Sequence, residues 1–204
     1  MLLPTNQLSP RELYRFLSGA VAPRPICFAS TVSAEGVVNL SPYSFFNVLS
    51  VDPPLLGFSP LLSGKDGHRK DTLNNVLAVP EVVINMVQHD VAQQMSDTSA
   101  PFPPEINEFG EVGLTEVASA TVRPPRVGEC AVAFECTVDR VISFGDGPLA
   151  GNLVIARVQA IHVDDDFLTT EGKLDAGLLD LIGRMGGSQY VRASGEALFV
   201  MQKP

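Results

Sequence analysis

Residues 39–60 decide the fold, and their sequence is Asn39-Leu-Ser-Pro-Tyr-Ser-Phe-Phe-Asn-Val-Leu-Ser-Val-Asp-Pro-Pro-Leu-Leu-Gly-Phe-Ser-Pro60. Its two apolar runs, 42–51 and 54–60, are separated by Asp-Pro-Pro, and proline confines each run to a short or edge strand. Short polar side chains interrupt both runs at Asn39, Ser41, Ser44, Asn47 and Ser59. Buried polar groups need partners, so the pattern predicts strands with a polar ligand lying along them. The alternative is that Ser-Pro and Asp-Pro-Pro simply mark turns.

The sequence on either side indicates further short strands with a few helices between them. Ser9, Pro10 and Glu12 form the start signature of a helix. Strands are predicted at 26–33, 37–40, 81–87, 130–145, 152–165 and 197–201, and helices at 9–19, 71–79, 90–97 and 174–182. Because helices do not alternate regularly with strands, the pattern favours a mainly β, Greek-key type barrel over a βαβ fold. Neither G-x-G-x-x-G nor G-x-x-x-x-G-K-[ST] occurs, so neither a dinucleotide fold nor a P-loop is supported.

The chain of 204 residues is predicted to form one domain over residues 1–204. The segment at about 97–128 is rich in Pro and Gly and is interpreted as an irregular excursion from that domain. With 45% hydrophobic and 18% charged residues, the composition is globular.

The chain is acidic, with 14 Lys and Arg against 23 Asp and Glu and a formal net charge of −9. This balance argues against general binding to nucleic acid or to anionic membranes. The N-terminus lacks signal-peptide features and no apolar run approaches the ~18 residues that span a bilayer, so a cytoplasmic location is expected.

The three cysteines, Cys27, Cys130 and Cys136, and the three histidines show no metal-binding spacing. We expect buried, reduced cysteines and no metal site.

Positive charge gathers in Ser-Gly-Lys-Asp-Gly-His-Arg-Lys-Asp-Thr-Leu-Asn-Asn, residues 63–75, which holds Lys65, His68, Arg69 and Lys70. Two flexible cations, the Thr72 hydroxyl and the free N–H groups of a helix start together predict a phosphate site. The alternative is a solvated charged loop.

The ordered combination of residues 39–60, Arg-Lys-Asp-Thr-Leu-Asn-Asn at 69–75 and Val-Val-Ile-Asn-Met-Val at 82–87 resembles the flavin reductase-like family of FMN-binding split-barrel proteins. The resemblance continues through residues 151–165 and 182–190, and so covers about residues 20–192. It implies a six-stranded antiparallel Greek-key split barrel that forms a homodimer, with FMN rather than FAD bound near the subunit interface.

The resemblance also assigns a cofactor site. The positions that match the family pattern are Asn39, Ser41, Tyr43, Ser44 and Phe45 along the isoalloxazine and ribityl chain, Asn47 in the same loop, Phe58, Ser59 and Pro60 on the next strand, Arg69, Lys70 and Thr72 at the phosphate, and Asn85 beside the flavin.

The chemistry implied by the family is hydride transfer from NAD(P)H to flavin, for which the protein supplies orientation and electrostatics. Thr31 is a candidate for the catalytic region by its place in the first hairpin. His162 is another, although the Asp-His pair of short flavin reductases is replaced here by Asn152-Leu153. Arg184, for the nucleotide side, and Tyr190, for catalysis, lie in a segment that matches the family loosely, and a plain Gly-rich turn is the alternative.

The leading prediction is therefore an NAD(P)H-dependent flavin reductase, with a nicotinamide donor and a partner monooxygenase as expected partners. The rivals are an FMN-binding electron carrier or flavin-storage module, an oxidase of the pyridoxamine phosphate type, and a flavin-free module. The missing Asp-His pair favours the carrier.

Overall fold

The computed structural model describes residues 1–202, and within them the main feature is a seven-stranded sheet. The strands are β1 (Cys27–Val32), β2 (Val38–Tyr43), β3 (Phe46–Val51), β4 (Pro54–Phe58), β5 (Glu81–Met86), β8 (Val132–Ser143) and β9 (Asn152–Val163). Their order is β2-β1-β5-β8-β9-β4-β3, and every neighbouring pair is antiparallel. The mainly β, antiparallel prediction is confirmed, but the predicted six strands are seven and the barrel is not closed.

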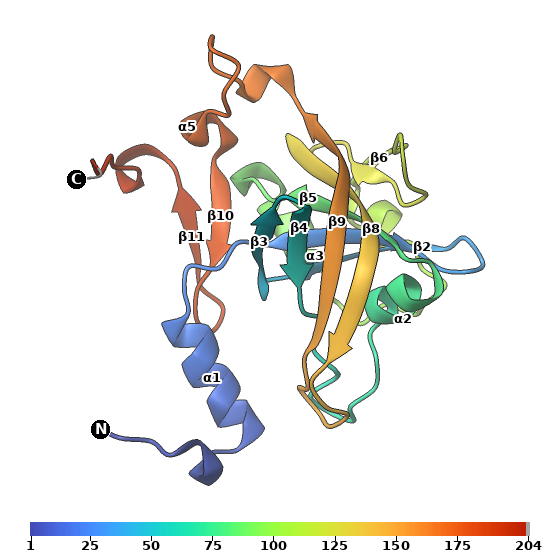
Figure 1. Cartoon of the computed structure of the whole chain (residues 1–204), viewed down its shortest axis with the longest axis vertical. Coiled ribbons are helices and arrows are strands. Elements are labelled where there is room, and N and C mark those ends of the chain that lie inside the picture. The colour runs from blue at the N-terminus through green and yellow to red at the C-terminus, as the bar shows by residue number, and fades with distance from the viewer. Residues whose placement is uncertain (203–204) are drawn as a thin grey trace.

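The extra strand arises in the stretch that decides the fold. The predicted run 42–51 is split between β2 and β3, which lie at opposite ends of the strand order and are joined only by Ser44 and Phe45. The Ser59 N–H donates to the Phe45 carbonyl over 2.8 Å, which fixes this turn against the end of β4. The sheet must therefore curl until its two edges meet at the turn, and this gives the split-barrel shape (Figure 1).

The remaining elements are short. The helices are α1 (Pro10–Ala20), α2 (Asp71–Ala78), α3 (Ala92–Asp97), α4 (Glu108–Val112) and α5 (Ala176–Leu179), with 3₁₀ turns at Thr5–Gln7, His89–Val91, Asp165–Phe167 and Gly195–Ala197. Two small hairpins pair β6 (Glu116–Val117) with β7 (Arg126–Val127) and β10 (Leu181–Arg184) with β11 (Tyr190–Ala193). The predicted capping box of α1 is present, because Ser9 and Glu12 exchange hydrogen bonds.

Two predicted elements near the C-terminus are wrong. The helix expected at 174–182 is reduced to α5, because Asp180 has φ 45° and ends the helix just before β10. The strand expected at 197–201 is a 3₁₀ turn followed by extended chain. Its apolar residues Leu198–Met201 are exposed and have no strand beside them in the described chain.

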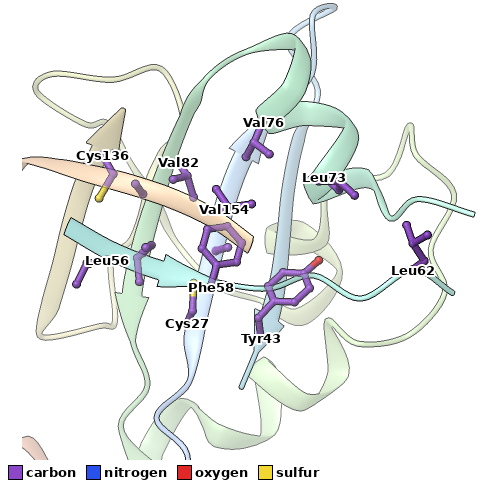
Figure 2. Packing of buried hydrophobic residues seen from close by; sticks show 13 residues of the cluster. Cys27, Tyr43, Leu56, Phe58, Leu62, Leu73, Val76, Val82, Cys136 and Val154 are labelled. Carbon is purple, nitrogen blue, oxygen red and sulfur yellow. The ribbon is translucent and has the colours of Figure 1, made fainter. Parts of the chain in front are cut away.

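Strand β1 separates two hydrophobic clusters, as the alternation of side chains along a strand requires. Cys27 and Ala29 belong to the inner cluster around Phe58 and Tyr43, shown in Figure 2, whereas Phe28 packs into the outer cluster with Phe109. Every residue of β1 is buried. Fully burying one large apolar side chain contributes about 1.5–3 kcal/mol, so these clusters dominate the stability of the fold.

Buried polar side chains of the sheet hold the excursion in place. Asn85 on β5 accepts from the Val127 N–H over 2.9 Å, and just beyond the excursion Gln88 accepts from the Ala131 N–H over 2.7 Å. Glu135 on β8 accepts from two further N–H groups of the excursion, those of Ala120 and Thr121. These hydrogen bonds attach the excursion to the sheet. Among the described residues, none of the helices has the length and hydrophobicity that a bilayer span requires.

Candidate functional site

Two adjoining clefts lie beside the stretch that decides the fold. The larger, of about 590 Å³, is bounded by β2, the loop 63–70, the start of α2 and the excursion from Thr98 to Glu108. The smaller, of about 230 Å³, is bounded by α1, the β2–β3 turn and the loop 59–64. Tyr43, Ser63, Gly64 and Lys70 line both clefts, so the two form one elongated groove.

The start of α2 faces the larger cleft without a side-chain cap. The N-cap residue is Lys70, and within residues 1–202 its side chain makes no capping hydrogen bond. The Thr72 hydroxyl instead donates to Asn39 Oδ1 over 2.7 Å, and Thr72 is only 1% exposed. The side chain of Thr72 therefore anchors the helix, and the first backbone N–H groups are what the helix offers to an anion.

Two cations stand beside this helix start. Within residues 1–202, neither Arg69 nor Lys70 makes an ion pair. His68 is paired with Asp66, whose pKa is lowered to about 2 by hydrogen bonds from Ser63 and then His68. The cleft walls desolvate the Lys70 ammonium and lower its pKa, an effect that a phosphate alongside would oppose.

Tyr43 stands at the junction of the two clefts with an unused hydrogen-bonding group. It is 6% exposed, and its hydroxyl has no hydrogen-bond partner of standard geometry among the described residues, although Ser41 and Thr72 lie near it. Figure 2 shows the phenol oxygen directed away from Phe58, toward Leu62 and Leu73. Burial raises the pKa of Tyr43 to about 12, so the phenol keeps its proton and can donate to a ligand.

The smaller cleft has an aromatic wall. The rings of Tyr14 and Phe45 stack with centroids 6.1 Å apart and an interplanar angle of 28°. Arg24, 6% exposed, lies 5.9 Å from the Phe45 ring centroid and donates to Ser44 Oγ over 3.3 Å. The groove thus combines an anion-binding end with an end lined by aromatic and small polar side chains, which suits a flat ring system that carries a phosphate.

The structure brings most of the predicted cofactor residues to this groove. Asn39, Ser41, Tyr43, Arg69, Lys70 and Thr72 line the larger cleft, and Tyr43, Ser44, Phe45, Ser59 and Lys70 line the smaller one. Asn47 lies with Ser44 and Phe45 in a neighbouring cleft of about 360 Å³.

Four predicted residues lie outside the groove. Phe58 is fully buried in the inner cluster, and Pro60 is buried with its carbonyl accepting from Asn152. The side-chain amide of Asn85 donates to the Phe28 carbonyl and accepts from the Val127 N–H. Thr31 is buried beneath the larger cleft, where its hydroxyl accepts from Asn75 over 3.1 Å. None of these four side chains lines the groove.

The three remaining candidates lie elsewhere. His162, on β9, is paired through Nε2 with the buried carboxylate of Glu135 and lines none of these clefts. Arg184 and Tyr190 face each other across the β10–β11 hairpin, with the guanidinium 4.5 Å from the ring centroid. Tyr190 lines a separate cleft of about 330 Å³.

Among residues 1–202, one group of potential metal ligands exists, and it lies outside the groove. His89, Asp90 and Asp180 each place one ligand atom within 4.8 Å of the others. Arg192 holds Asp180 in a two-pronged ion pair, which competes with any cation at that position.

Sequence reasoning missed Glu108, Arg24, Ser63 and Gly64. Glu108, 6% exposed, comes from the excursion and lines the larger cleft. Ser63 and Gly64 lie in the charged loop, where the Ser-Gly pair was an available signal. Glu108 and Arg24 carried no such signal, because their contacts with the groove come from distant parts of the chain.

Comparison with known proteins agrees with this geometry. The profile of the family described as "Flavin reductase like domain" matches residues 19–181. An uncharacterized protein of Halalkalibacterium halodurans is 41% identical over 192 residues, which are 93% of this chain and 91% of the relative. An uncharacterized protein of Aquifex aeolicus is 40% identical over 90% of this chain and 91% of its own length.

Solved structures give the same result. Nitrilotriacetate monooxygenase component B from Bacillus cereus is 31% identical with a TM-score of 0.90, covering 98% of each chain. The 2-nitrobenzoate 2-nitroreductase NbaA of Pseudomonas fluorescens is 28% identical with a TM-score of 0.86, covering 99% of this chain and 96% of its own. The chain belongs to the flavin reductase-like family of split-barrel proteins.

Proposed function

We propose that the chain binds FMN in the joined clefts and acts as an NAD(P)H-dependent flavin reductase. The observation that carries the proposal is the larger cleft of this acidic protein. Within residues 1–202 its helix start has no side-chain cap, Arg69 and Lys70 make no ion pair, and the Tyr43 hydroxyl has no hydrogen-bond partner of standard geometry. One phosphate dianion beside two cations and free N–H groups would satisfy all of them.

In this proposal the larger cleft binds the phosphate of FMN and the smaller cleft binds its ring system. Arg69, Lys70 and the first amides of α2 would hold the phosphate, and the β2–β3 turn with the Tyr14–Phe45 wall would hold the ring system. Bound FMN supplies the redox chemistry, taking hydride from a nicotinamide donor and passing electrons to an acceptor. In the part of the chain that the structure describes, neither carboxylates nor imidazoles line the smaller cleft, and the protein's part there is to orient the ring system.

The test is an absorbance spectrum of the purified protein with FMN, recorded before and after anaerobic addition of NADH or NADPH. We expect flavin bands that shift on binding and bleach within seconds of adding one of the two nucleotides. Free FMN with the same nucleotide is the control for uncatalysed reduction. A protein that leaves the FMN spectrum and fluorescence unchanged would overturn the proposal.

A second candidate function is an FMN-binding electron carrier, and the surroundings of Asn152 favour it. Asn152 stands where short flavin reductases have the Asp of their Asp-His pair. Its side chain donates to the Pro60 carbonyl and accepts from the Ser143 hydroxyl. Flavin bands that persist with both nucleotides but bleach with dithionite would select this function over the reductase.

We also propose that the functional unit is a homodimer. α1 and the C-terminal tail project from the barrel in Figure 1. Phe16 and Leu17 on α1 are 48% and 58% exposed, and Val48 and Val51 on the edge strand β3 are 59% and 86% exposed. Exposed apolar side chains gathered on a helix and an adjacent sheet edge are typical of an interface.

Substituting Phe16→Glu together with Val51→Glu is expected to convert the dimer to a monomer, because two buried charges would face the partner without compensation. Sedimentation velocity measures the change. Leu77→Glu on α2, where Leu77 is 49% exposed, is the matched control and should leave the dimer intact. A wild-type protein that sediments as a monomer contradicts the proposal.

For the electron acceptor we propose a partner monooxygenase in the cytoplasm. The support is the similarity to nitrilotriacetate monooxygenase component B and the burial of all three cysteines as free thiols.

A further inference from the structure

Glu108, the first residue of α4, reaches from the excursion into the sheet. Its carboxylate accepts from Asn39 Nδ2 over 2.6 Å and from the Leu40 N–H over 2.8 Å, both on β2. Glu108 is 6% exposed and Asn39 is 8% exposed. Bonds of this kind to a carboxylate are about twice as strong as bonds between neutral groups.

The contact continues through Asn39 to the phosphate end of the groove. A carboxylate can only accept, so Asn39 must direct its NH₂ group at Glu108 and its Oδ1 away from it. That Oδ1 accepts from the Thr72 hydroxyl over 2.7 Å. Thr72 lies in the first turn of α2, whose backbone N–H groups are those available to an anion. Glu108 is therefore bonded to the NH₂ group of Asn39, and the Oδ1 of Asn39 is bonded to the first turn of α2 through Thr72.

The negative charge of Glu108 would repel a phosphate bound in the same cleft, so the presence of this carboxylate calls for an explanation. Within residues 1–202 it makes no ion pair, and it lines the same cleft as Arg69 and Lys70. Burial raises the pKa of Glu108, and the nearby Asp71 carboxylate adds to the rise. Attachment alone does not require an acid at every point of the excursion, because Asn85 holds Val127 with a neutral amide.

We propose that Glu108 is a positioning residue for phosphate recognition, acting through Asn39 and Thr72 to hold the start of α2. The inference rests on the proposed binding of FMN at this groove. It assigns to the excursion a part in ligand affinity, because α4 carries the residue that orients the anion site.

The test compares two flavins that differ only in the phosphate, FMN and riboflavin, by fluorescence titration of the full-length protein. Glu108→Gln replaces one acceptor oxygen with a donor and cannot accept from both Leu40 and Asn39 as they stand. Thr72→Val removes the hydroxyl at nearly constant shape. Each substitution is expected to lower FMN affinity about tenfold and to leave riboflavin affinity within about twofold.

The double variant separates positioning from general loosening of the fold. Since both residues act through Asn39, Glu108→Gln with Thr72→Val should lose no more FMN affinity than either single variant. Glu129→Gln is the matched control, because among the described residues Glu129 accepts only from the Thr115 N–H of the excursion, and it lines neither cleft. It should change neither affinity.

Other results would overturn the inference. An unchanged ratio of FMN to riboflavin affinity in Glu108→Gln, or full additivity in the double variant, excludes the proposed path. If Glu108→Gln fails to fold, an unchanged ratio in Thr72→Val excludes it equally. A wild-type protein that binds no flavin overturns the proposed function itself, which is a different result from flavin binding that is insensitive to these substitutions.

Discussion

Replacing Lys70 with Met and Arg69 with Gln is expected to weaken FMN binding about 100-fold or more while riboflavin binding stays close to wild type. Neither cation makes an ion pair within the described residues, and both line the larger cleft beside the start of α2. A hydrogen bond to a charged group contributes about 1.5–3 kcal/mol, and two such losses correspond to at least two orders of magnitude in affinity.

The choice of substitutions follows from the surroundings of each side chain. Methionine keeps the apolar stem of Lys70, whose ammonium lies 5.6 Å from the Tyr43 ring centroid, and removes only the charge. Thr72 is left unchanged because it is buried and bonded to Asn39, so its loss would disturb the helix as well as the ligand. Lys65→Met is the matched control, since Lys65 belongs to the same loop but lines neither cleft.

The measurement is a fluorescence titration of each variant with both flavins, and it also examines salt dependence. Wild-type affinity for FMN should fall with rising ionic strength more steeply than that of the double variant, because fewer charge contacts remain to be screened. An equal loss of riboflavin and FMN affinity would place the two cations away from the phosphate and would refute their assignment.

Local patterns predicted much of the fold. The capping residues at Ser9 and Glu12 correctly predicted α1, and the apolar run after Pro80 correctly predicted β5. The turn at Ser44–Phe45 was missed because no proline or glycine marks it. The apolar run 197–201 was predicted as a strand on composition alone, whereas a strand needs a neighbour and the described chain places none beside it.

For the site too, residues close together in the sequence could be predicted, whereas contacts between distant segments could not. Arg69, Lys70 and the helix start are close in sequence, so their shared cleft could be predicted from the loop itself. Asn85 and His162 were candidates through the family resemblance, Asn85 as the strand residue beside the flavin and His162 as the nearest histidine to the replaced Asp-His pair. Their actual partners, Val127 and Glu135, are separated from them by 42 and 27 residues, and only tertiary structure shows that they serve the excursion and the sheet.

Glu135 is expected to be the polar side chain whose loss destabilises the fold most. It is fully buried on β8 and accepts from the N–H groups of Ala120, over 2.7 Å, and Thr121, over 2.6 Å. It also accepts from the Thr121 hydroxyl and is paired with His162. Glu135→Gln replaces one acceptor oxygen with an NH₂ group, which then faces the donor groups of Ala120 or Thr121. The substitution also removes the negative charge that these donors stabilise. We expect a loss on the order of 3 kcal/mol in the free energy of unfolding.

The stabilising contribution of Glu135 should depend on pH in a direction that its pKa shift determines. Burial by itself would raise the pKa of Glu135, but the hydrogen bonds from Thr121, Ala120 and His162 outweigh burial and lower the pKa to about 2. A carboxyl whose pKa is lower in the folded state stabilises the fold above its unfolded pKa of about 4.5, and this contribution is lost as the pH falls toward 2. The difference in unfolding free energy between wild type and Glu135→Gln should therefore be largest near neutral pH and shrink below about pH 4.5.

Urea unfolding between pH 7 and pH 3 measures this difference, with Glu81→Gln as the matched control. Glu81 also holds the excursion, through the N–H and guanidinium of Arg123, but its partner is 60% exposed, so its loss should cost less than about 1 kcal/mol. A Glu135→Gln difference that stays constant from pH 7 to pH 3 would mean that the cost comes from altered packing. A difference that shrinks only for Glu135 would show that this buried charge, with its ring of donors, is what holds residues 120–121 of the excursion against the barrel.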